Sequence, residues 1–230
     1  MKNANFNIVQ LLLVAVLVFV SGSLFVACDG LSASRTEARR MQNNTQLRGI
    51  HQSLVTYANS NKGSFPGINR RGDNEGIEVE SRFQILLEGH FFTPEYAISP
   101  SETEASIAPW DGTSPVATTN YSYAMLQVPD ANPKKTDSEQ GRRSDWAMTL
   151  NSQAIAVSDR NTGTASATSS IHTRSNQTGW SGSVLWNDSA VMFEPDDTFT
   201  TKYVGGEMNT SDKLFEAEGN YDALLIHTGN

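Results

Sequence analysis

Acidic side chains are the residues of this sequence whose type and spacing come nearest to a chemical site. Asp159 begins an Asp-Arg-Asn segment, Asp188 lies between Asn187 and Ser189, and Asp196 is the first of two adjacent aspartates. Carboxylate and carbonyl oxygens are the ligands that calcium prefers. If the fold brings them together, these three aspartates can hold a calcium ion. A solvated acidic turn accounts for the same residues, because the Asp159 segment lacks the glutamate that closes an EF-hand loop.

Other chemical groups form no recognisable set. The four histidines are scattered, and none belongs to a pair spaced to place two metal ligands on one helix face: His51, His90, His172 and His227. The sequence has no Gly-x-Ser-x-Gly elbow and no glycine-rich phosphate loop. We therefore expect no catalytic residues, no cofactor-binding residues and no enzyme activity. A hydrolase of the cell envelope is kept as an alternative to a non-catalytic protein. His51 is predicted to be a hydrogen-bonded core residue.

Composition excludes several classes of protein. The chain has 17 Lys and Arg residues against 25 Asp and Glu residues, a net charge of −8, with no basic run. Nucleic-acid surfaces need clustered positive charge, so no nucleic-acid partner is expected. A single cysteine excludes a disulfide framework and a multi-cysteine zinc cluster. The richness in Ser, Thr, Asn and Gly favours a location outside the cytoplasm.

An apolar run near the N-terminus indicates on which side of a membrane the rest of the chain lies. Residues 8–28 include no ionisable side chain except the final Cys28. As a helix rising about 1.5 Å per residue, this run is long enough to cross a hydrocarbon layer about 30 Å thick. Three interpretations remain open: a retained membrane helix, a cleaved signal peptide, or a lipoprotein signal that ends at Cys28.

A second helical pattern follows the apolar run. Between residues 34 and 61 the sequence has no proline and one glycine, and apolar residues recur at steps of three and four: Leu47, Ile50, Leu54, Tyr57 and Ala58. Gly63 is suited to the left-handed residue after a helix, and Pro66 follows closely. The pattern predicts one long helix from about residue 6 to residue 60, whose end packs on a globular body.

The remainder of the chain is predicted to be α+β. A short helix is expected at residues 81–88. Short β-like runs separated by turn residues predict strands at residues 121–127, 153–157, 183–186, 190–193 and 223–227. The clearest hairpin joins the third and fourth of these strands through Asn187, Asp188 and Ser189. Arg71-Gly72-Asp73 matches an adhesion motif that is expected often by chance.

Several segments, which together span most of the chain, resemble the type IV pilin and type II secretion pseudopilin superfamily. Residues 6–12, FNIVQLL, are similar in order to the processing region of those proteins. The resemblance implies cleavage of a leader after Asn5, methylation of Phe6, and a role for Gln10 in assembly. Asn5 stands where the family has glycine, and Gln10 stands where it has glutamate. Residues 37–50, EARRMQNNTQLRGI, and 57–66, YANSNKGSFP, resemble a large group of bacterial prepilin-like proteins.

This resemblance implies an α+β, pilin-like fold class, with a long N-terminal membrane-spanning helix packed on a small antiparallel β-sheet domain. The expected organisation is a leader-like segment at residues 1–5, a helix at 6–62 with a membrane span at about 8–28, and a globular domain at 63–230.

The expected function is a non-catalytic, pilin-like subunit of a secretion or pilus assembly. It would be a single-pass protein of the inner membrane with its C-terminal domain in the periplasm or outside the cell. Its partners would be other pilin-like subunits and the secretion machinery, in a homo- or hetero-oligomeric filament. The alternative is a lipid-anchored envelope lipoprotein that uses Cys28 as its lipid site and acts as a binding module.

Overall fold

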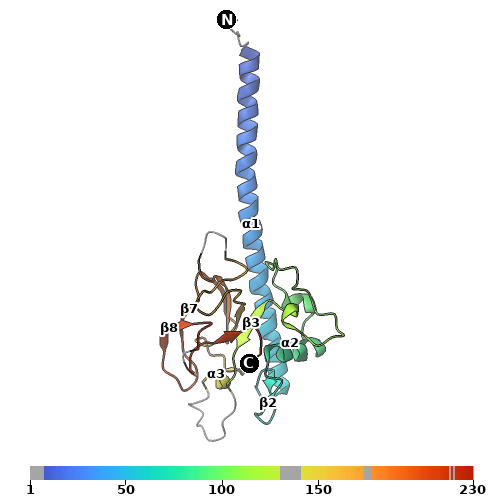
Figure 1. Cartoon of the computed structure of the whole chain (residues 1–230), viewed down its shortest axis with the longest axis vertical. Coiled ribbons are helices and arrows are strands. Elements are labelled where there is room, and N and C mark those ends of the chain that lie inside the picture. Colours follow the sequence, from blue (N-terminus) through green and yellow to red (C-terminus); the bar gives the residue numbers. More distant parts are fainter. Residues whose placement is uncertain (1–7, 130–140, 174–177, 218, 220, 230) are drawn as a thin grey trace. The chain divides into compact units, whose positions relative to one another are not determined.

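The computed structural model describes residues 8–229 apart from 130–140, 174–177, 218 and 220, and side chains of the first helix from residue 34 onward. The chain divides into two compact units, Met1–Arg39 and Arg40–Asn230. In the first unit the described structure is helical. The second unit contains the rest of the first helix, a sheet and the loops around them (Figure 1).

The elements follow one another in a mixed order. The helices are α1 (Ile8–Ser60), α2 (Val79–Glu88) and α3 (Gly141–Asp145), with 3₁₀ turns η1 (Pro94–Ala97) and η2 (Thr118–Asn120). The strands are β1 (Gly67–Ile68), β2 (Asn74–Glu75), β3 (Tyr123–Leu126), β4 (Ile155–Asp159), β5 (Gly182–Trp186), β6 (Val191–Glu194), β7 (Thr198–Thr201), β8 (Asn209–Lys213) and β9 (Leu225–Ile226).

The last part of α1 is a core element of the second unit. Leu47, Ile50, Leu54 and Ala58 of the predicted stripe have no exposed surface. Tyr57, which was predicted to share that face, is only half-buried. Spacing of three and four residues places these side chains on one side of the helix, so their burial fixes which face of α1 meets the sheet.

The predicted helix stop is confirmed. Lys62 and Gly63 adopt left-handed backbone angles, with φ of 54° and 88°. The Gly63 N–H donates to the Ala58 carbonyl at 2.9 Å, which satisfies one of the carbonyl groups that a helix end leaves without a partner. A residue without a side chain adopts this φ at little cost, so the glycine ends α1 here.

Gly49 is the one glycine inside the packed part of α1, and we expect its replacement by alanine to destabilise the protein. In an exposed helix this change stabilises by about 1 kcal/mol. Here an added Cβ would lie 2.4 Å from Cε1 of Tyr96, well inside van der Waals contact. Overpacking of this kind costs about 1–3 kcal/mol, so a lower melting temperature is expected. Tryptophan fluorescence of the full chain during heating measures it.

The control for this prediction is Gly49→Ala in a variant in which Tyr96 is replaced by a smaller residue. In a Tyr96→Leu background the added methyl group has room, and Gly49→Ala should then raise the melting temperature relative to Tyr96→Leu alone. If Gly49→Ala stabilises the wild-type chain, the close approach of Tyr96 is not a constraint on the fold.

The main sheet is antiparallel throughout. Its strand order in the described part of the chain is β6-β5-β4-β3-β9. The five predicted strands and the predicted helix α2 are confirmed with small shifts at their ends. The predicted β5–β6 hairpin is also confirmed: Ser189, with φ of 75°, occupies the turn, and the Trp186 N–H donates to the Ala190 carbonyl at 2.9 Å.

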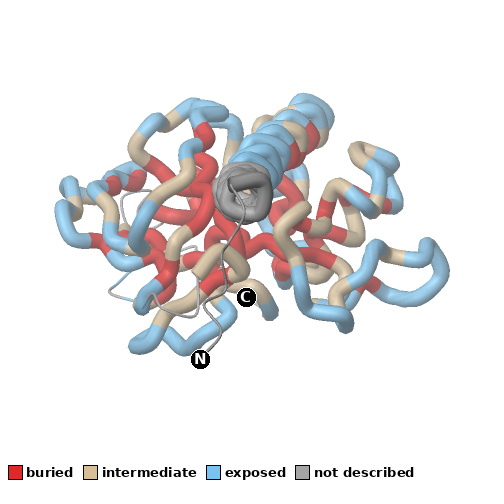
Figure 2. The backbone as a smooth tube through the Cα atoms, turned by 90° about the horizontal axis from the view of Figure 1, so that it is seen from above, coloured by how far each residue is buried: buried red, intermediate tan, exposed pale blue. Residues whose placement is uncertain are grey.

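Both faces of the central strands are covered. Every residue of β4 and β5 is buried. On one face, side chains of α1 contact the sheet, as the bonds of Asn43 to Asp159 and Ser183 demonstrate. Elsewhere Tyr203 donates to the Ile155 carbonyl at 3.0 Å and Phe199 of β7 packs edge-on against Trp186. Figure 2 shows the buried positions concentrated in this body and the exposed ones in its loops.

The predicted fold class, an α+β pilin-like fold with a membrane-spanning helix, is wrong. Beyond α1, the described part of the chain is mostly a small antiparallel sheet domain with short helices, and no helix among the described residues combines the length and apolar character needed to cross a membrane. The described side chains of α1 begin with charged residues such as Arg35, Glu37 and Arg39, and charges are costly in hydrocarbon. The predicted span at residues 8–28 lies outside the side chains that the structure describes.

Candidate functional site

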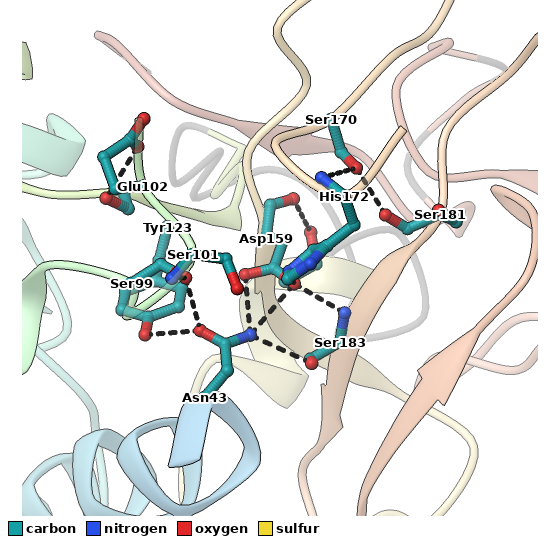
Figure 3. Close-up of polar contacts among 12 residues, drawn as sticks. Asn43, Ser99, Ser101, Glu102, Tyr123, Asp159, Ser170, His172, Ser181 and Ser183 are labelled. Atoms are coloured by element: carbon teal, nitrogen blue, oxygen red, sulfur yellow. Dashed lines mark hydrogen bonds and ion pairs between the residues drawn. The ribbon is translucent and has the colours of Figure 1, made fainter. Parts of the chain in front are cut away.

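A group of buried polar contacts joins α1 to three strands of the sheet, and we call it the Asn43 cluster. Its members come from α1, from the segments after η1 and before β5, and from β3, β4 and β5: Asn43, Ser99, Tyr123, Asp159, His172 and Ser183. Figure 3 shows the Asn43 amide surrounded by the side chains of Ser99, Tyr123, Asp159 and Ser183, with His172 beside Asp159. All except His172 are buried in the described body.

Asn43 occupies the centre of this cluster. Its amide nitrogen donates to both carboxylate oxygens of Asp159, at 2.9 and 3.0 Å, and to Ser183 Oγ at 2.9 Å. Its amide oxygen accepts from Ser99 Oγ at 2.8 Å and from the Tyr123 hydroxyl at 2.9 Å. Because the acceptors surround the nitrogen and the donors surround the oxygen, the orientation of the amide follows from the network.

Asp159 is the charged member of the cluster, and it has no exposed surface. Besides Asn43, its Oδ2 accepts from the Ser183 backbone N–H at 2.6 Å and contacts His172 Nε2 at 3.1 Å. A buried carboxylate needs several donors to replace water, and these groups supply them. The His172 ring also packs edge-on against Phe193 at 5.2 Å, which holds the segment before β5 against the sheet.

Tyr123 acts in this cluster as a neutral donor. Burial and the nearby Asp159 carboxylate raise the pKa of its hydroxyl well above the usual value near 10. The hydroxyl therefore keeps its proton at physiological pH and can donate to Asn43 or to Gln46 Oε1, at 2.9 Å each.

The cluster has the residue types of a Ser-His-Asp triad but a different geometry. His172 uses Nε2 to contact Asp159, while Ser170 Oγ accepts from the His172 backbone N–H at 3.0 Å. In a triad the imidazole must accept a proton from the serine hydroxyl. Within the described residues no hydroxyl group bonds to the His172 ring, and the contacts of Ser170, His172 and Asp159 connect loops to strands.

A second cluster ties α1 to the β5–β6 turn. His51 is buried; its Nδ1 lies 2.8 Å from Ser189 Oγ and its Nε2 lies 3.5 Å from Asn187 Oδ1. The Asn187 amide nitrogen in turn donates to the carbonyls of Asp145 and Ala147, at 2.6 and 2.9 Å. The prediction that His51 is a hydrogen-bonded core residue is confirmed.

A buried histidine, His51, and a half-buried one, His227, give the protein an expected dependence on pH. Burial lowers the pKa of His51 and of His227 below 6.5, and this effect exceeds the opposing influence of Asp188 on His51 and of the Tyr121 carbonyl on His227. In the unfolded chain both imidazoles take up protons near pH 6.5, whereas in the folded chain they do so only at lower pH. The free energy of unfolding is therefore expected to be highest above about pH 7 and to fall as the pH is lowered through 6.5.

Urea titrations followed by tryptophan fluorescence at a series of pH values measure this dependence. A His51→Gln/His227→Gln variant should show a flatter profile between about pH 7 and pH 5.5 than wild type. The control is His90→Asn, because His90 is exposed and its left-handed backbone tolerates asparagine. A profile that stays unchanged in the double variant would contradict the assignment to these two groups.

The predicted calcium ligands are not brought together. Asp188 and Asp196 lie in exposed turns, where they accept backbone N–H groups of Ala190 and Thr198 at 2.9 and 3.0 Å. Asp159 meets the start of β5 and Asp188 follows its end, about 16 Å away for five extended residues. Among the described residues no group of three or more His, Cys, Asp and Glu side chains lies close enough to hold a metal ion.

The other predicted site residues lie outside the described side chains: Asn5, Phe6, Gln10 and Cys28. The sequence pattern also missed residues that are important in the structure. Asn43 lies four positions before Leu47 on the buried stripe, and this spacing was the available signal for its burial. Arg82 is buried on the apolar face of α2, next to Phe83.

No protein-family model, curated protein or solved structure matches this chain. The resemblance of residues 34–66 and the geometry of the described residues are therefore the basis for a functional proposal.

Proposed function

We propose that this chain is a non-catalytic, pilin-like subunit of a type II secretion or type IV pilus-like assembly. In this proposal the N-terminal apolar segment attaches the subunit to the inner membrane. The second unit lies on the periplasmic or extracellular side, where its partners are other pilin-like subunits and the secretion machinery in a homo- or hetero-oligomeric filament.

The observation that carries this proposal is where the resembling residues lie. Within residues 34–66, Leu47, Ile50 and Leu54 have no exposed surface. Phe65 is also fully buried and packs edge-on against Trp146 at 5.4 Å. The similarity therefore involves residues on which the packing of the body depends, which supports the proposed relationship more strongly than a match between exposed residues would.

The buried polar clusters give a second line of support. Asn43 and His51 bind one face of α1 to the sheet at positions more than two helical turns apart. In both clusters the side chains of Asn43 and His51 make hydrogen bonds to the sheet and its turn, so these side chains connect the helix to the body. A subunit that assembles through its helix needs such a connection, because force on the helix must reach the body.

The test is the mass of the N-terminus in protein purified from native membranes. Cleavage after Asn5 with methylation of Phe6 is the expected result. A diacylated Cys28 would replace the proposal with the lipoprotein alternative. An intact Met1 would point to an attached protein without pilin processing.

Two variants sharpen this measurement. Asn5→Gly restores the residue that leader cleavage normally requires, so the cleaved fraction should rise. Cys28→Ser removes the only lipidation site of the alternative, and under the proposal it should leave the N-terminal mass pattern unchanged apart from the substitution. If Cys28→Ser instead releases the protein from the membrane fraction, the lipoprotein alternative is correct.

A further inference from the structure

A cavity of about 470 Å³ lies where the end of α1, the β1–β2 hairpin and α2 meet. Figure 1 shows the hairpin and α2 beside this end of α1. The residues that line the cavity come from all three elements: Tyr57, Asn61, Ile68, Asn69, Arg70, Arg71, Glu75 and Ile85. Its volume lies in the range of about 300–1,000 Å³ that is typical of small-molecule sites.

Two adjacent arginines dominate the charge of this cavity. Arg70 and Arg71 are exposed, and in the part of the chain that the structure describes neither guanidinium makes a hydrogen bond or an ion pair. One acidic side chain, Glu75, faces them in the lining. The cavity is thus locally positive in a chain of net charge −8, which favours an anionic occupant over a cationic one.

The walls of the cavity are less polar than its rim. Ile68 is buried and Ile85 is half-buried, and both contribute to the lining. Tyr57 is also half-buried, with its ring held edge-on against Phe91 at 5.9 Å. Burial and Glu75 raise the pKa of the Tyr57 hydroxyl, so this group remains a proton donor at neutral pH. An apolar or aromatic group can therefore contact the wall while an anionic group reaches the arginines.

The hairpin that carries the arginines is held by its own hydrogen bonds. Asn69 Oδ1 accepts from the backbone N–H groups of Arg71 and Asp73, at 2.9 and 3.0 Å. Outside the hairpin, Arg143 donates to the Gly72 carbonyl at 2.6 Å and to Asn74 Oδ1 at 2.5 Å. The backbone under Arg70 and Arg71 is thus positioned before any ligand arrives, which reduces the entropic cost of binding.

The geometry points to a binding site for a small anion that carries a carboxylate or phosphate group on an apolar or aromatic body. Planar guanidinium groups bind both kinds of anion with two parallel hydrogen bonds, and two adjacent arginines offer this geometry twice. The apolar wall distinguishes this site from a simple patch of positive charge. None of the residues that line this site belongs to the Asn43 or His51 cluster, so the binding test does not depend on either cluster.

Isothermal titration of the full chain in non-ionic detergent tests this site, with phenyl phosphate and benzoate as probes. We expect saturable binding of at least one of them, and the comparison between them identifies phosphate or carboxylate as the preferred group. Inorganic phosphate and benzyl alcohol, which each retain half of the recognised chemistry, should bind at least about tenfold more weakly. Raising the salt concentration from about 50 to 500 mM should weaken binding of the preferred probe.

The decisive variant is Arg70→Gln/Arg71→Gln, which should weaken binding of the preferred probe by at least about tenfold. Its control is Arg35→Gln/Arg39→Gln, which removes the same charge from exposed positions on α1 and should leave the affinity unchanged. All four side chains are exposed, so both variants should keep the wild-type melting temperature. Equal affinity in the two variants, or no saturation by either probe up to about 10 mM, would overturn the proposal.

Discussion

Asp159→Ala is expected to lower the free energy of unfolding by about 3–5 kcal/mol, which is a large part of the stability of a domain of this size. The substitution removes a buried carboxylate that accepts from Asn43 and the Ser183 N–H and contacts His172. One N–H of the Asn43 amide and the backbone N–H of Ser183 would remain buried without an acceptor, and each such group costs about 1–3 kcal/mol. The change also leaves a void between α1 and the sheet.

The four tryptophans lie in the second unit, so fluorescence during urea titration of the full chain in detergent follows the unfolding of that unit. Asp73→Ala is the matched control, because Asp73 is exposed and this change should alter the free energy of unfolding by less than about 0.5 kcal/mol. Asp159→Asn keeps the shape but loses the charge and one acceptor, and should lie between the two. A loss below about 1 kcal/mol in Asp159→Ala would mean that the cluster does not secure the helix.

The sequence predicts those elements whose signals are local. The end of α1 at Gly63 depends on a backbone preference of the residue itself, and the turn at Ser189 depends on short polar side chains in a row. The buried stripe from Leu47 to Ala58 depends on spacing along one helix. Each of these features is determined within about ten residues, and each is found in the structure.

The strands β7 and β8 could not be predicted in this way. Their sequences, TFTT and NTSDK, contain one large apolar side chain between them and alternate poorly. They are joined instead by a contact between Thr201 and the buried Asp212, whose Oδ2 also accepts from the Ala223 N–H at 2.6 Å. Such pairing depends on the hydrogen bonds of individual polar side chains, and polarity alone assigns those residues to a loop.

The partners of the candidate-site residues could not be predicted from local sequence either. Asp159 was singled out from the sequence because it is a carboxylate in a turn-like context, and the calcium hypothesis followed from that context. In the structure the carboxylate lies at the end of a fully buried strand, and its donors come from α1, from β5 and from His172. Tertiary packing determines which hydrogen-bond donors surround a buried carboxylate. Residue type alone could therefore identify Asp159 but not its partners.

Arg82→Ala is expected to be about as destabilising as Asp159→Ala, with a loss of about 3–5 kcal/mol. Arg82 has no exposed surface; its guanidinium donates to the carbonyls of Ile77 and Leu126, at 2.6 and 2.7 Å, and lies 4.9 Å from the ring centre of Trp146. Burial lowers its pKa to about 9, so the group stays charged at neutral pH. The side chain thereby connects α2 to β3 and to the Trp146 segment.

Two further substitutions of Arg82, together with one control at another position, separate the contributions of packing, charge and hydrogen bonds. Arg82→Met restores packing volume but cannot donate, so it should recover only about 1–2 kcal/mol of the loss in Arg82→Ala. Arg82→Lys keeps a charge but cannot reach two carbonyls with one planar group, and it should remain clearly less stable than wild type. Arg39→Ala, at an exposed position, is the control and should change stability by less than about 0.5 kcal/mol. Urea titration measures the free energy of unfolding of Arg82→Ala and of these three variants. If Arg82→Met were as stable as wild type, the two hydrogen bonds of Arg82 would make no net contribution to stability. Such an outcome is known for buried charges that apolar side chains of similar volume replace.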